Sequence, residues 1–382
     1  MAGFSTAKSL RSNGFAGRVT LIGAESYLPY DRPPLSKQFL VGEADEESLQ
    51  LASQRAIEEL DIEFIAGEAA TGVDLQANQV TTASKTFVFD TLVMATGVRA
   101  RTLPDTAHLL NVRSLRTMAD ARALRRAYQP GSDLVIIGAG FIGLEVAASA
   151  RKLGINVSVV ETEPIPLGKR LHAPIGEWVR RLHESHGVHF YTGIGVAAID
   201  SMGERATQVG LTDGHLLHAD NILVGIGTVP NTDLLAHTML DLANGIGTDE
   251  VGQAAPGLYA VGDVANFHHR GYERRVRLEH RTNANEMAEI VARAINGDRV
   301  PYVPVPSFWT DQYESRLQMY GTIEPDSTLE VTSGSLYSDR WAGVYRTGDH
   351  LDAALGVNVA KELIPYRREL ASRFDAARIS AA

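Results

Sequence analysis

The chain has 382 residues, with 36 lysines and arginines against 46 aspartates and glutamates, so its formal net charge is −10. This length predicts about two or three domains, and the acidic balance argues against a general nucleic-acid binder. The sequence has no cysteine, which excludes disulfides, thiolate metal sites, iron–sulfur ligation by this chain and a redox-active dithiol. No apolar run approaches the ~18 residues of a membrane span and no signal-peptide pattern opens the chain, so we expect a cytoplasmic protein.

The first 25 residues predict half of a dinucleotide-binding unit. Residues 4–13 have a helical pattern, and residues 18–25 (RVTLIGAE) form a strand that ends in an acid. Gly3 would be the last glycine of the fingerprint, while its first strand and first two glycines do not precede it. An unrelated helix and strand at the start of a domain is the alternative.

Residues 26–40 (SYLPYDRPPLSKQFL) form a stiff, proline-rich loop. Its prolines fix an extended path, and Ser36 is a candidate cap for a short helix that begins near Lys37. Arg32 and Lys37 are the cations of this loop, and either could face a flavin ring. The competing interpretation is an ordinary solvated lysine.

The next hundred residues predict alternating elements. We expect a helix over residues 48–60, short strands at 62–65, 79–82 and 86–88, and a helix from Met118 onward. Residues 90–97 (DTLVMATG) are an apolar strand that ends in Thr-Gly. A strand of this kind belongs to a parallel sheet buried on both faces.

Residues 133–161 carry a complete dinucleotide fingerprint in strand, turn, helix and strand order. Gly138 permits the tight turn, Gly140 lets the backbone approach a pyrophosphate, and Gly143 lets the helix pack close to the sheet. Glu161 ends the second strand, where a carboxylate binds the adenosine ribose and repels a 2′-phosphate. This pattern predicts NADH rather than NADPH; the alternative is a glycine-rich turn without a ligand.

The remainder of this unit repeats features seen earlier. We expect a loop with Lys169 and Arg170, a helix over 175–186, strands at 188–191 and 195–199, and a turn at 213–214. Residues 221–227 (NILVGIG) match DTLVMATG, so the chain contains an internal duplication. Residues 258–263 (LYAVGD) then return to the first sheet, where Asp263 either binds a sugar hydroxyl or only forms a turn.

The sequence therefore predicts an α/β fold with two Rossmann-like dinucleotide-binding domains, one inserted in the other, plus a C-terminal α+β domain. A helix is expected over 286–295, antiparallel strands beyond Pro306, and a closing helix over 365–377. We place the outer domain at residues 1–103 and 229–307, the inserted domain at 104–228 and the third domain at 308–382.

Seven motifs in this order, PYDRPPLSK, ATG, GAGFIGLE, the terminal Glu161, LYAVGD, RLEHRTNA and FWTDQY, resemble the flavin-dependent ferredoxin reductases of bacterial oxygenase systems. The resemblance covers nearly the whole chain and implies FAD and NADH as cofactors, with FAD bound by the outer domain and NADH by the inserted one. The residues that it assigns to FAD are Ala2, Gly3, Ala24, Glu25, Lys37, Ala70, Arg116, Asp263, Arg281 and Trp309. Further candidates for the same site are Arg32 and the ATG motif, Ala95, Thr96 and Gly97. Those that it assigns to NADH are Gly138, Gly140, Ile142, Gly143, Glu161 and Gly227.

The same resemblance implies catalytic roles for Lys37 and for Glu145, which would lie near the nicotinamide and the flavin. Arg281 departs from the Trp or Val of several relatives. The opening strand of the FAD unit is not in the sequence. We therefore expect the chain to start downstream of its natural first residue, at a Met within the glycine motif. The competing hypothesis is a truncated form that binds FAD weakly or not at all.

The implied activity is electron transfer from NADH through FAD to an acidic [2Fe–2S] ferredoxin that serves an oxygenase. Residues 268–281 carry five arginines against two glutamates, so Arg270, Arg274, Arg275 and Arg277 are candidate docking residues. A solvated loop is the alternative for this segment. Rival functions are reduction of rubredoxin, a quinone or a small acceptor, and a non-catalytic NADH sensor resembling apoptosis-inducing factor. We expect no metal, nucleic-acid or membrane site.

Overall fold

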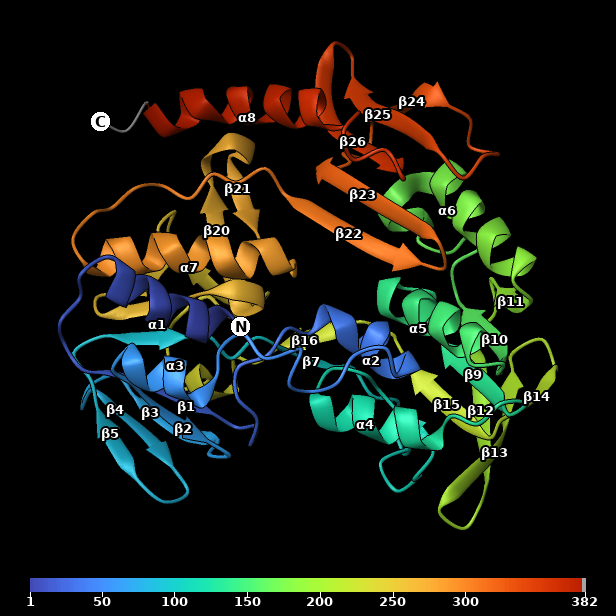
Figure 1. The fold of residues 1–382 in the computed structure, drawn as a ribbon, viewed down its shortest axis with the longest axis horizontal. Coiled ribbons are helices and arrows are strands. Elements are labelled where there is room, and N and C mark those ends of the chain that lie inside the picture. The colour runs from blue at the N-terminus through green and yellow to red at the C-terminus, as the bar shows by residue number, and fades with distance from the viewer. Residues whose placement is uncertain (380–382) are drawn as a thin grey trace.

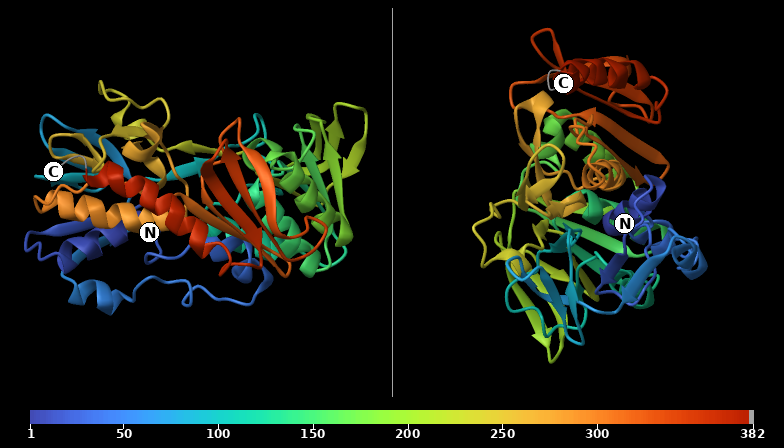
Figure 2. Two further views of the ribbon diagram at one scale, coloured as in Figure 1. Left: turned by 90° about the horizontal axis from the view of Figure 1, so that it is seen from above. Right: turned by 90° about the vertical axis from the view of Figure 1, so that its left-hand side faces the viewer.

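The computed structural model describes residues 1–379, with side chains described through Phe374, and has three parts. An outer unit and an inner unit lie at opposite ends of the long axis, and a C-terminal unit lies beside the inner one (Figures 1 and 2). Among the described residues we find no helix with the length and apolar character that a membrane crossing needs. The mixed α/β class predicted from the sequence is confirmed.

The inner unit is a parallel sheet with helices against it. Its order β11-β10-β9-β15-β8 places β9 in the middle. Every residue of β15 and the last four of β9 are buried, as the apolar runs predict for strands covered on both faces. Its elements are β8 (Val112–Arg113), α4 (Met118–Ala127), β9 (Asp133–Ile137), α5 (Phe141–Lys152), β10 (Asn156–Glu161), α6 (Gly168–Ser185), β11 (Val188–Thr192), β12 (Val196–Met202), β13 (Arg205–Leu211), β14 (Leu216–His218) and β15 (Asn221–Val224).

The outer unit is built from two stretches of chain that flank the inner one. The first stretch contains α1 (Ala2–Ser12), β1 (Val19–Gly23), α2 (Gln38–Val41), α3 (Gln54–Glu59), β2 (Ile62–Ala66), β3 (Ala70–Asp74), β4 (Gln79–Thr82), β5 (Thr86–Val88), β6 (Leu92–Met94) and β7 (Val98–Ala100). The second contains β16 (Thr228–Pro230), β17 (Ile246–Thr248), β18 (Gln253–Ala255), β19 (Leu258–Ala260), β20 (Ala265–His269), β21 (Arg274–Val276) and α7 (Arg281–Ile295). Because β19 pairs in parallel with β6, the chain does return to the first sheet, which confirms the predicted insertion.

The parallel strand pairs of the outer unit lie in two separate sheets. One is β1 with β2, and the other has the order β18-β19-β6. In the part of the chain that the structure describes, β1 has no second neighbour and β6 has β19 as its single neighbour. Helix α1 packs against both β1 and α7 (Figure 1).

The C-terminal unit is the predicted antiparallel sheet with a closing helix. Its five strands have the order β22-β23-β26-β25-β24. Trp341 packs edge-on against Trp178 of α6, with 5.8 Å between the ring centroids. Tyr345 donates a hydrogen bond of 2.7 Å to the Leu171 carbonyl. This unit therefore shares a core with the inner unit. Its elements are β22 (Ser307–Gln312), β23 (Ser315–Gly321), β24 (Thr328–Gly334), β25 (Trp341–Thr347), β26 (His350–Val357) and α8 (Ile364–Ile379).

Three predicted helix boundaries are wrong. The helix expected over residues 286–295 is α7, which begins five residues earlier, at Arg281. The helix expected over residues 48–60 is only α3, capped by the Ser53 hydroxyl, which accepts from the Ala56 N–H at 3.2 Å. The preceding residues instead pair with the proline-rich loop, since the Leu51 N–H donates to the Pro29 carbonyl at 2.7 Å. Ser36 caps no helix: it ends a 3₁₀ turn, Pro33–Ser36, and α2 begins after Lys37 without a side-chain cap.

The loop predicted around Lys169 and Arg170 is also wrong. Both residues lie in α6, which starts at Gly168 and runs through a kink at His172, where the backbone has a φ of 60°. Pro174 lies two residues after the kink, in the first turn of the straight part, where its missing N–H is tolerated. The sequence pattern detected the straight part beyond the kink and missed the short turn before it.

Candidate active site

The glycine fingerprint of the inner unit forms a sterically closed turn between β9 and α5. Gly138 has a φ of +103°, and a Cβ there would lie 2.5 Å from the Gly225 carbonyl oxygen. A Cβ at Gly143 would lie 2.4 Å from the Gly138 carbonyl oxygen, whereas at Gly140 nothing comes closer than 3.7 Å. The open space at Gly140 adjoins the N-terminus of α5, which has no side-chain cap. These features fit a pyrophosphate against free backbone N–H groups.

Glu161 lies at the carboxyl end of β10, directly beside this turn. Its carboxylate accepts hydrogen bonds from the Ala139 N–H at 2.7 Å and from the Glu163 N–H at 3.0 Å. Ile142 is 46% exposed on the first turn of α5, and Gly227, with a φ of +100°, follows β15. All six residues assigned to NADH thus lie at or next to the carboxyl ends of three neighbouring strands, the edge at which open α/β sheets bind nucleotides.

In the outer unit, Gly3 holds α1 close to the sheet. A Cβ added there would lie 3.1 Å from Leu21 of β1 and 3.2 Å from Ala95 just beyond β6. This is the packing role of the third glycine in a dinucleotide fingerprint. Ala2 packs closely against Gly262, where an added Cβ would lie 2.8 Å from the Ala2 side chain.

Charged side chains surround the start of α1. Glu25 accepts hydrogen bonds from Tyr30 at 2.7 Å and from Arg32 at 2.9 Å. Arg116 and Asp263 form an ion pair of 2.7 Å. Both pairs lie close to Met1, at the start of α1.

Two buried polar atoms in this region have no hydrogen-bond partner among the described residues: Arg32 Nε and His280 Nδ1. Burial lowers the pKa of His280 to about 4, although the nearby carboxylates of Asp263 and Glu279 oppose the shift. Since buried polar groups are almost always satisfied, these two atoms indicate a polar ligand. The residues present therefore fit FAD. His280 was not among the predicted site residues, although it lies within the RLEHRTNA motif.

The other residues assigned to FAD lie around this cluster. Ala24 directly follows β1, and Ala70 begins β3. The ATG motif follows β6: Ala95 contacts the Gly3 position, Thr96 donates to the Asn231 carbonyl at 2.7 Å, and the Gly97 position lies 3.3 Å from Arg116. Arg281, at the start of α7, is bound to Asp31 through two contacts of 2.9 Å, and Trp309 lies partly exposed on β22.

The two predicted catalytic residues meet in a buried ion pair. Lys37 Nζ lies 2.6 Å from Glu145 Oε2, and the side chains are only 11% and 5% exposed. Ser36 donates a hydrogen bond of 2.5 Å to the same oxygen, and Thr310 donates to Oε1 at 2.8 Å. Glu145 of the inner unit thus holds a loop of the outer unit and a strand of the C-terminal unit. Sequence reasoning missed Ser36 and Thr310, because nothing in the chain order brings them near residue 145.

The candidate docking arginines are bound to carboxylates of this chain. Arg270 pairs with Glu250 at 2.5 Å, Arg274 with Glu324 at 2.7 Å and Arg277 with Glu279 at 2.6 Å, and Arg275 lies 3.9 Å from Asp241. Three of these four acids lie outside residues 268–281, so the excess of positive charge counted along the segment is balanced in space. Arg274 and Arg275 remain the more accessible, with side chains 49% and 43% exposed.

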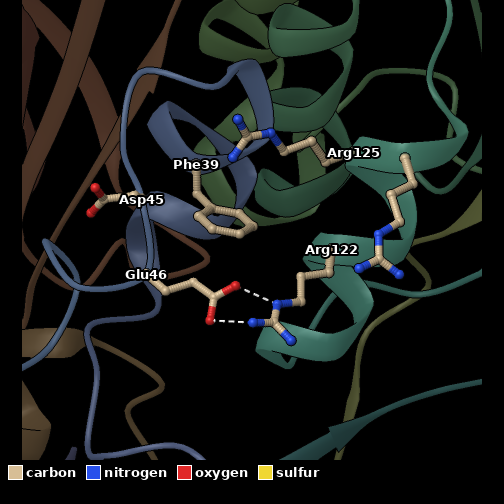
Figure 3. Close-up of a pocket in the computed structure, with 6 residues that line it drawn as sticks. Phe39, Asp45, Glu46, Arg122 and Arg125 are labelled. Atoms are coloured by element: carbon tan, nitrogen blue, oxygen red, sulfur yellow. Dashed lines mark hydrogen bonds and ion pairs between the residues drawn. The ribbon is translucent and has the colours of Figure 1, made fainter.

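A separate cavity of about 480 Å³ lies between α2, the loop after it and α4. Arg122 makes a two-pronged ion pair with Glu46 there, and Arg125 lies over the Phe39 ring at 5.4 Å (Figure 3). None of its lining residues was assigned to a cofactor. Glu46 neutralises Arg122, and we assign the cavity no ligand.

The family described as "Pyridine nucleotide-disulphide oxidoreductase" matches residues 1–288, and the family described as "Reductase C-terminal" matches residues 307–382. Rhodocoxin reductase of Rhodococcus erythropolis is 39% identical over 97% of this chain and 87% of its own length. Putidaredoxin reductase of Pseudomonas putida is 36% identical over 94% of this chain and 86% of its own length.

A crystal structure of the covalent complex between putidaredoxin reductase and putidaredoxin matches with a TM-score of 0.94 and 35% identity. The match covers 97% of this chain and 91% of that chain. The two family matches together span both dinucleotide units and the antiparallel sheet, in agreement with the fold. This chain belongs to the pyridine nucleotide-disulphide oxidoreductase family, in its branch with the reductase C-terminal domain.

Proposed function

We infer that this protein is an FAD-dependent NADH:ferredoxin oxidoreductase, which passes electrons from NADH to a [2Fe–2S] ferredoxin of an oxygenase system. The observation that carries this function is the buried Lys37–Glu145 pair, which joins the NADH cradle to the loop of the outer unit. Relatives with ferredoxin reductase names share more than a third of the sequence over nearly the whole chain.

We propose that each cofactor is held by the residues that the resemblance assigned. The cradle at Gly138, Gly140 and Gly143 binds the pyrophosphate of NADH, and Glu161 binds its adenosine ribose. Ala2, Gly3, Glu25, Arg116 and Asp263 bind FAD, together with the other residues of that set. Bound FAD would supply two-electron chemistry toward NADH and one-electron chemistry toward the ferredoxin. The corresponding domains are 1–103 with 229–307, 104–228 and 308–382.

Lys37 and Glu145 have electrostatic roles. The positive charge of Lys37 would favour the anionic, reduced form of a bound flavin. Glu145 orients the Lys37 ammonium through a contact of 2.6 Å. With no cysteine in the sequence, the chain has no dithiol to receive electrons, so they pass directly to an outside acceptor.

We propose that an acidic ferredoxin docks on Arg270, Arg274, Arg275 and Arg277. Arg274 and Arg275 contribute most, because their side chains are about half exposed. An acidic partner would compete with Glu324 and Asp241 for them, so its association should be weakened by salt. We also propose a cytoplasmic location, because NADH is available there as the reductant.

NADH-dependent reduction of cytochrome c, measured with and without added [2Fe–2S] ferredoxin, tests the function. We expect the purified protein to show flavin absorbance and the rate to depend on the ferredoxin. Equal rates with and without ferredoxin would favour a small acceptor, and tight NADH binding without turnover would favour a sensor. A folded but colourless protein would contradict the FAD assignment.

The docking proposal has its own test. Replacing Arg274 and Arg275 together by Gln should lower kcat/KM for ferredoxin about tenfold at low salt, and much less at high salt. The matched control is Arg299→Gln, since Arg299 is 46% exposed and is also paired with a carboxylate, Asp249. An equal effect of the control, or a rate that does not respond to salt, would contradict docking at these arginines.

A further inference from the structure

Glu145 lies at the end of a continuous string of hydrogen bonds. Thr310 Oγ1 donates to Glu145 Oε1 at 2.8 Å, and Gln312 Nε2 donates to Thr310 Oγ1 at 3.2 Å. Gln312 Oε1 lies 2.8 Å from His183 Nε2, and Tyr313 Oη lies 3.1 Å from His183 Nδ1. The string therefore crosses from β22 of the C-terminal unit to α6 of the inner unit.

The direction of donation along the string follows from Glu145. An ionised carboxylate can only accept, so Thr310 donates to it and uses its own lone pair for the Gln312 amide. The Gln312 oxygen then faces His183, which must donate from Nε2. Burial lowers the pKa of His183 to about 4, so at neutral pH the ring is neutral and its Nδ1 accepts from the Tyr313 hydroxyl.

Solvent has no access to the middle of the string. Thr310 and Gln312 are each 3% exposed and His183 is fully buried. The space that adjoins Thr310 and Gln312, between Leu167, Trp178 and Val179, has no room for a water. A lost member of the string therefore cannot be replaced by water, and its neighbours would be left unsatisfied or would rotate.

We propose that His183 is a positioning residue for electron entry: through Gln312 and Thr310 it fixes the Glu145 carboxylate so that one oxygen stays on Lys37. His183 touches neither cofactor site, and it acts only through the string. The proposal rests on the proposed function, because the Lys37–Glu145 pair matters to the reaction only if NADH reduces a bound flavin there.

A double-mutant cycle between His183→Leu and Thr310→Val tests the string. We expect each substitution to slow anaerobic flavin reduction by NADH about tenfold, and the double variant to be about tenfold slower as well, because both act on one contact. Thr310→Ser keeps the hydroxyl and should restore the rate. The affinity for NAD⁺ should change less than about twofold in all of them, since the cradle is untouched.

His269→Leu is the matched control. His269 is also fully buried, its pKa is also lowered to about 4 by burial, and its Nε2 donates at 2.8 Å, but to the Pro304 carbonyl and not toward Glu145. Its substitution should leave flavin reduction unchanged and combine additively with Thr310→Val. Additive effects of His183→Leu and Thr310→Val, or an equal effect of His269→Leu, would overturn the proposal.

A second measurement does not require the cofactor. Histidine ¹⁵N NMR of the apoprotein should show His183 neutral with its proton on Nε2 at pH 7, and Thr310→Val should shift its resonances. A proton on Nδ1, or a charged ring, would also overturn the proposal. If instead the wild-type protein did not reduce flavin with NADH while the NMR result held, the proposed function would fail and the string would stand.

Discussion

The two dinucleotide units differ in how their parallel strands are joined. In the inner unit β9 lies between β10 and β15, whereas in the outer unit the corresponding strands, β1 and β6, share no neighbour in the described part of the chain. The consequence is visible in burial: β15 is buried throughout, while two of the three residues of β6 and four of the five of β1 are only partly buried. In the inner unit β9 therefore leads into the glycine turn and also covers both of its neighbours.

The nucleotide sites differ in the same way. The inner site is shaped by backbone, with glycines whose Cβ positions fall within 2.5 Å of carbonyl oxygens. The outer site is shaped by charge, with Glu25, Arg32, Arg116 and Asp263 grouped around the start of α1. We therefore expect the inner site to fail through steric changes and the outer site through changes in charge or pH.

The largest difference should come from truncating apolar strand residues. Ile136→Ala in β9, which is fully buried, should lower the free energy of unfolding by about 4 kcal/mol. Leu21→Ala in β1, which is half-buried, should lower it by about 1 kcal/mol. Urea unfolding followed by circular dichroism would measure both, and equal losses would contradict the contrast between the two sheets.

A smaller contrast is expected between the two packing glycines. Gly143→Ala places its Cβ 2.4 Å from a backbone oxygen, which cannot move freely, so we expect about 3 kcal/mol of destabilisation and loss of NAD⁺ binding. Gly3→Ala meets only the ends of Leu21 and Ala95 at 3.1 and 3.2 Å, and should cost under about 1 kcal/mol. Calorimetric titration with NAD⁺ and thermal unfolding test the pair; a harmless Gly143→Ala would show that the turn can relax.

Acid should affect the outer unit first, because it holds two of the histidines with a lowered pKa, His269 and His280, and the inner unit holds His183. Burial lowers each pKa from 6.5 to about 4, so the unfolded state binds protons that the folded state does not. The free energy of unfolding is therefore unaffected by these histidines above pH 6.5 and falls as the pH drops from 6.5 toward 4. At pH 5 the loss is about 2 kcal/mol for each histidine.

FAD fluorescence and NAD⁺ affinity, followed from pH 7 to pH 5, would show which unit responds. We expect FAD release to precede the loss of NAD⁺ binding, and His269→Gln to make the free energy of unfolding less sensitive to acid. If the nicotinamide site failed first, burial of these histidines would not be what limits stability in acid.

The smallest expected effect concerns the two acids that end equivalent strands. Glu161→Gln keeps an acceptor for the Ala139 N–H but removes the charge that repels a 2′-phosphate, so the preference for NADH over NADPH should fall about tenfold, or 1.4 kcal/mol. Glu25→Gln should leave this ratio unchanged and weaken FAD instead, because Glu25 holds Arg32. Fluorescence titrations with both nucleotides would decide, and an unchanged ratio in Glu161→Gln would contradict its role.

The architecture could be predicted from the sequence because strongly patterned local signals specify it. The fingerprint from Asp133 to Glu161, the duplication and the alternating strands beyond Pro306 all depend on neighbours in the chain. Boundaries set by tertiary contacts could not: residues 48–52 pair with the proline-rich loop, and α6 begins before its kink. The strand β3 also went unnoticed, because ATGVD has few apolar residues.

For the site, the sequence identified individual residues better than their partners. Lys37 and Glu145 were both singled out, but their contact joins positions 108 apart, and the hydroxyls of Ser36 and Thr310 complete it. The docking arginines show the reverse problem. Their charge was counted along the segment, whereas Glu250, Glu324 and Asp241 balance it from other elements.

The position of Thr310 bears on how chimeric reductases should be built. The family boundary falls between residues 288 and 307, so a crossover there would take the carboxylate of Glu145 from one parent and its hydroxyl donor from the other. Recombination libraries made from related reductases with this crossover would then combine active-site residues from two different parents. A junction placed after Tyr313 keeps Glu145, Thr310, Gln312 and His183 from the same parent, and should yield more functional hybrids.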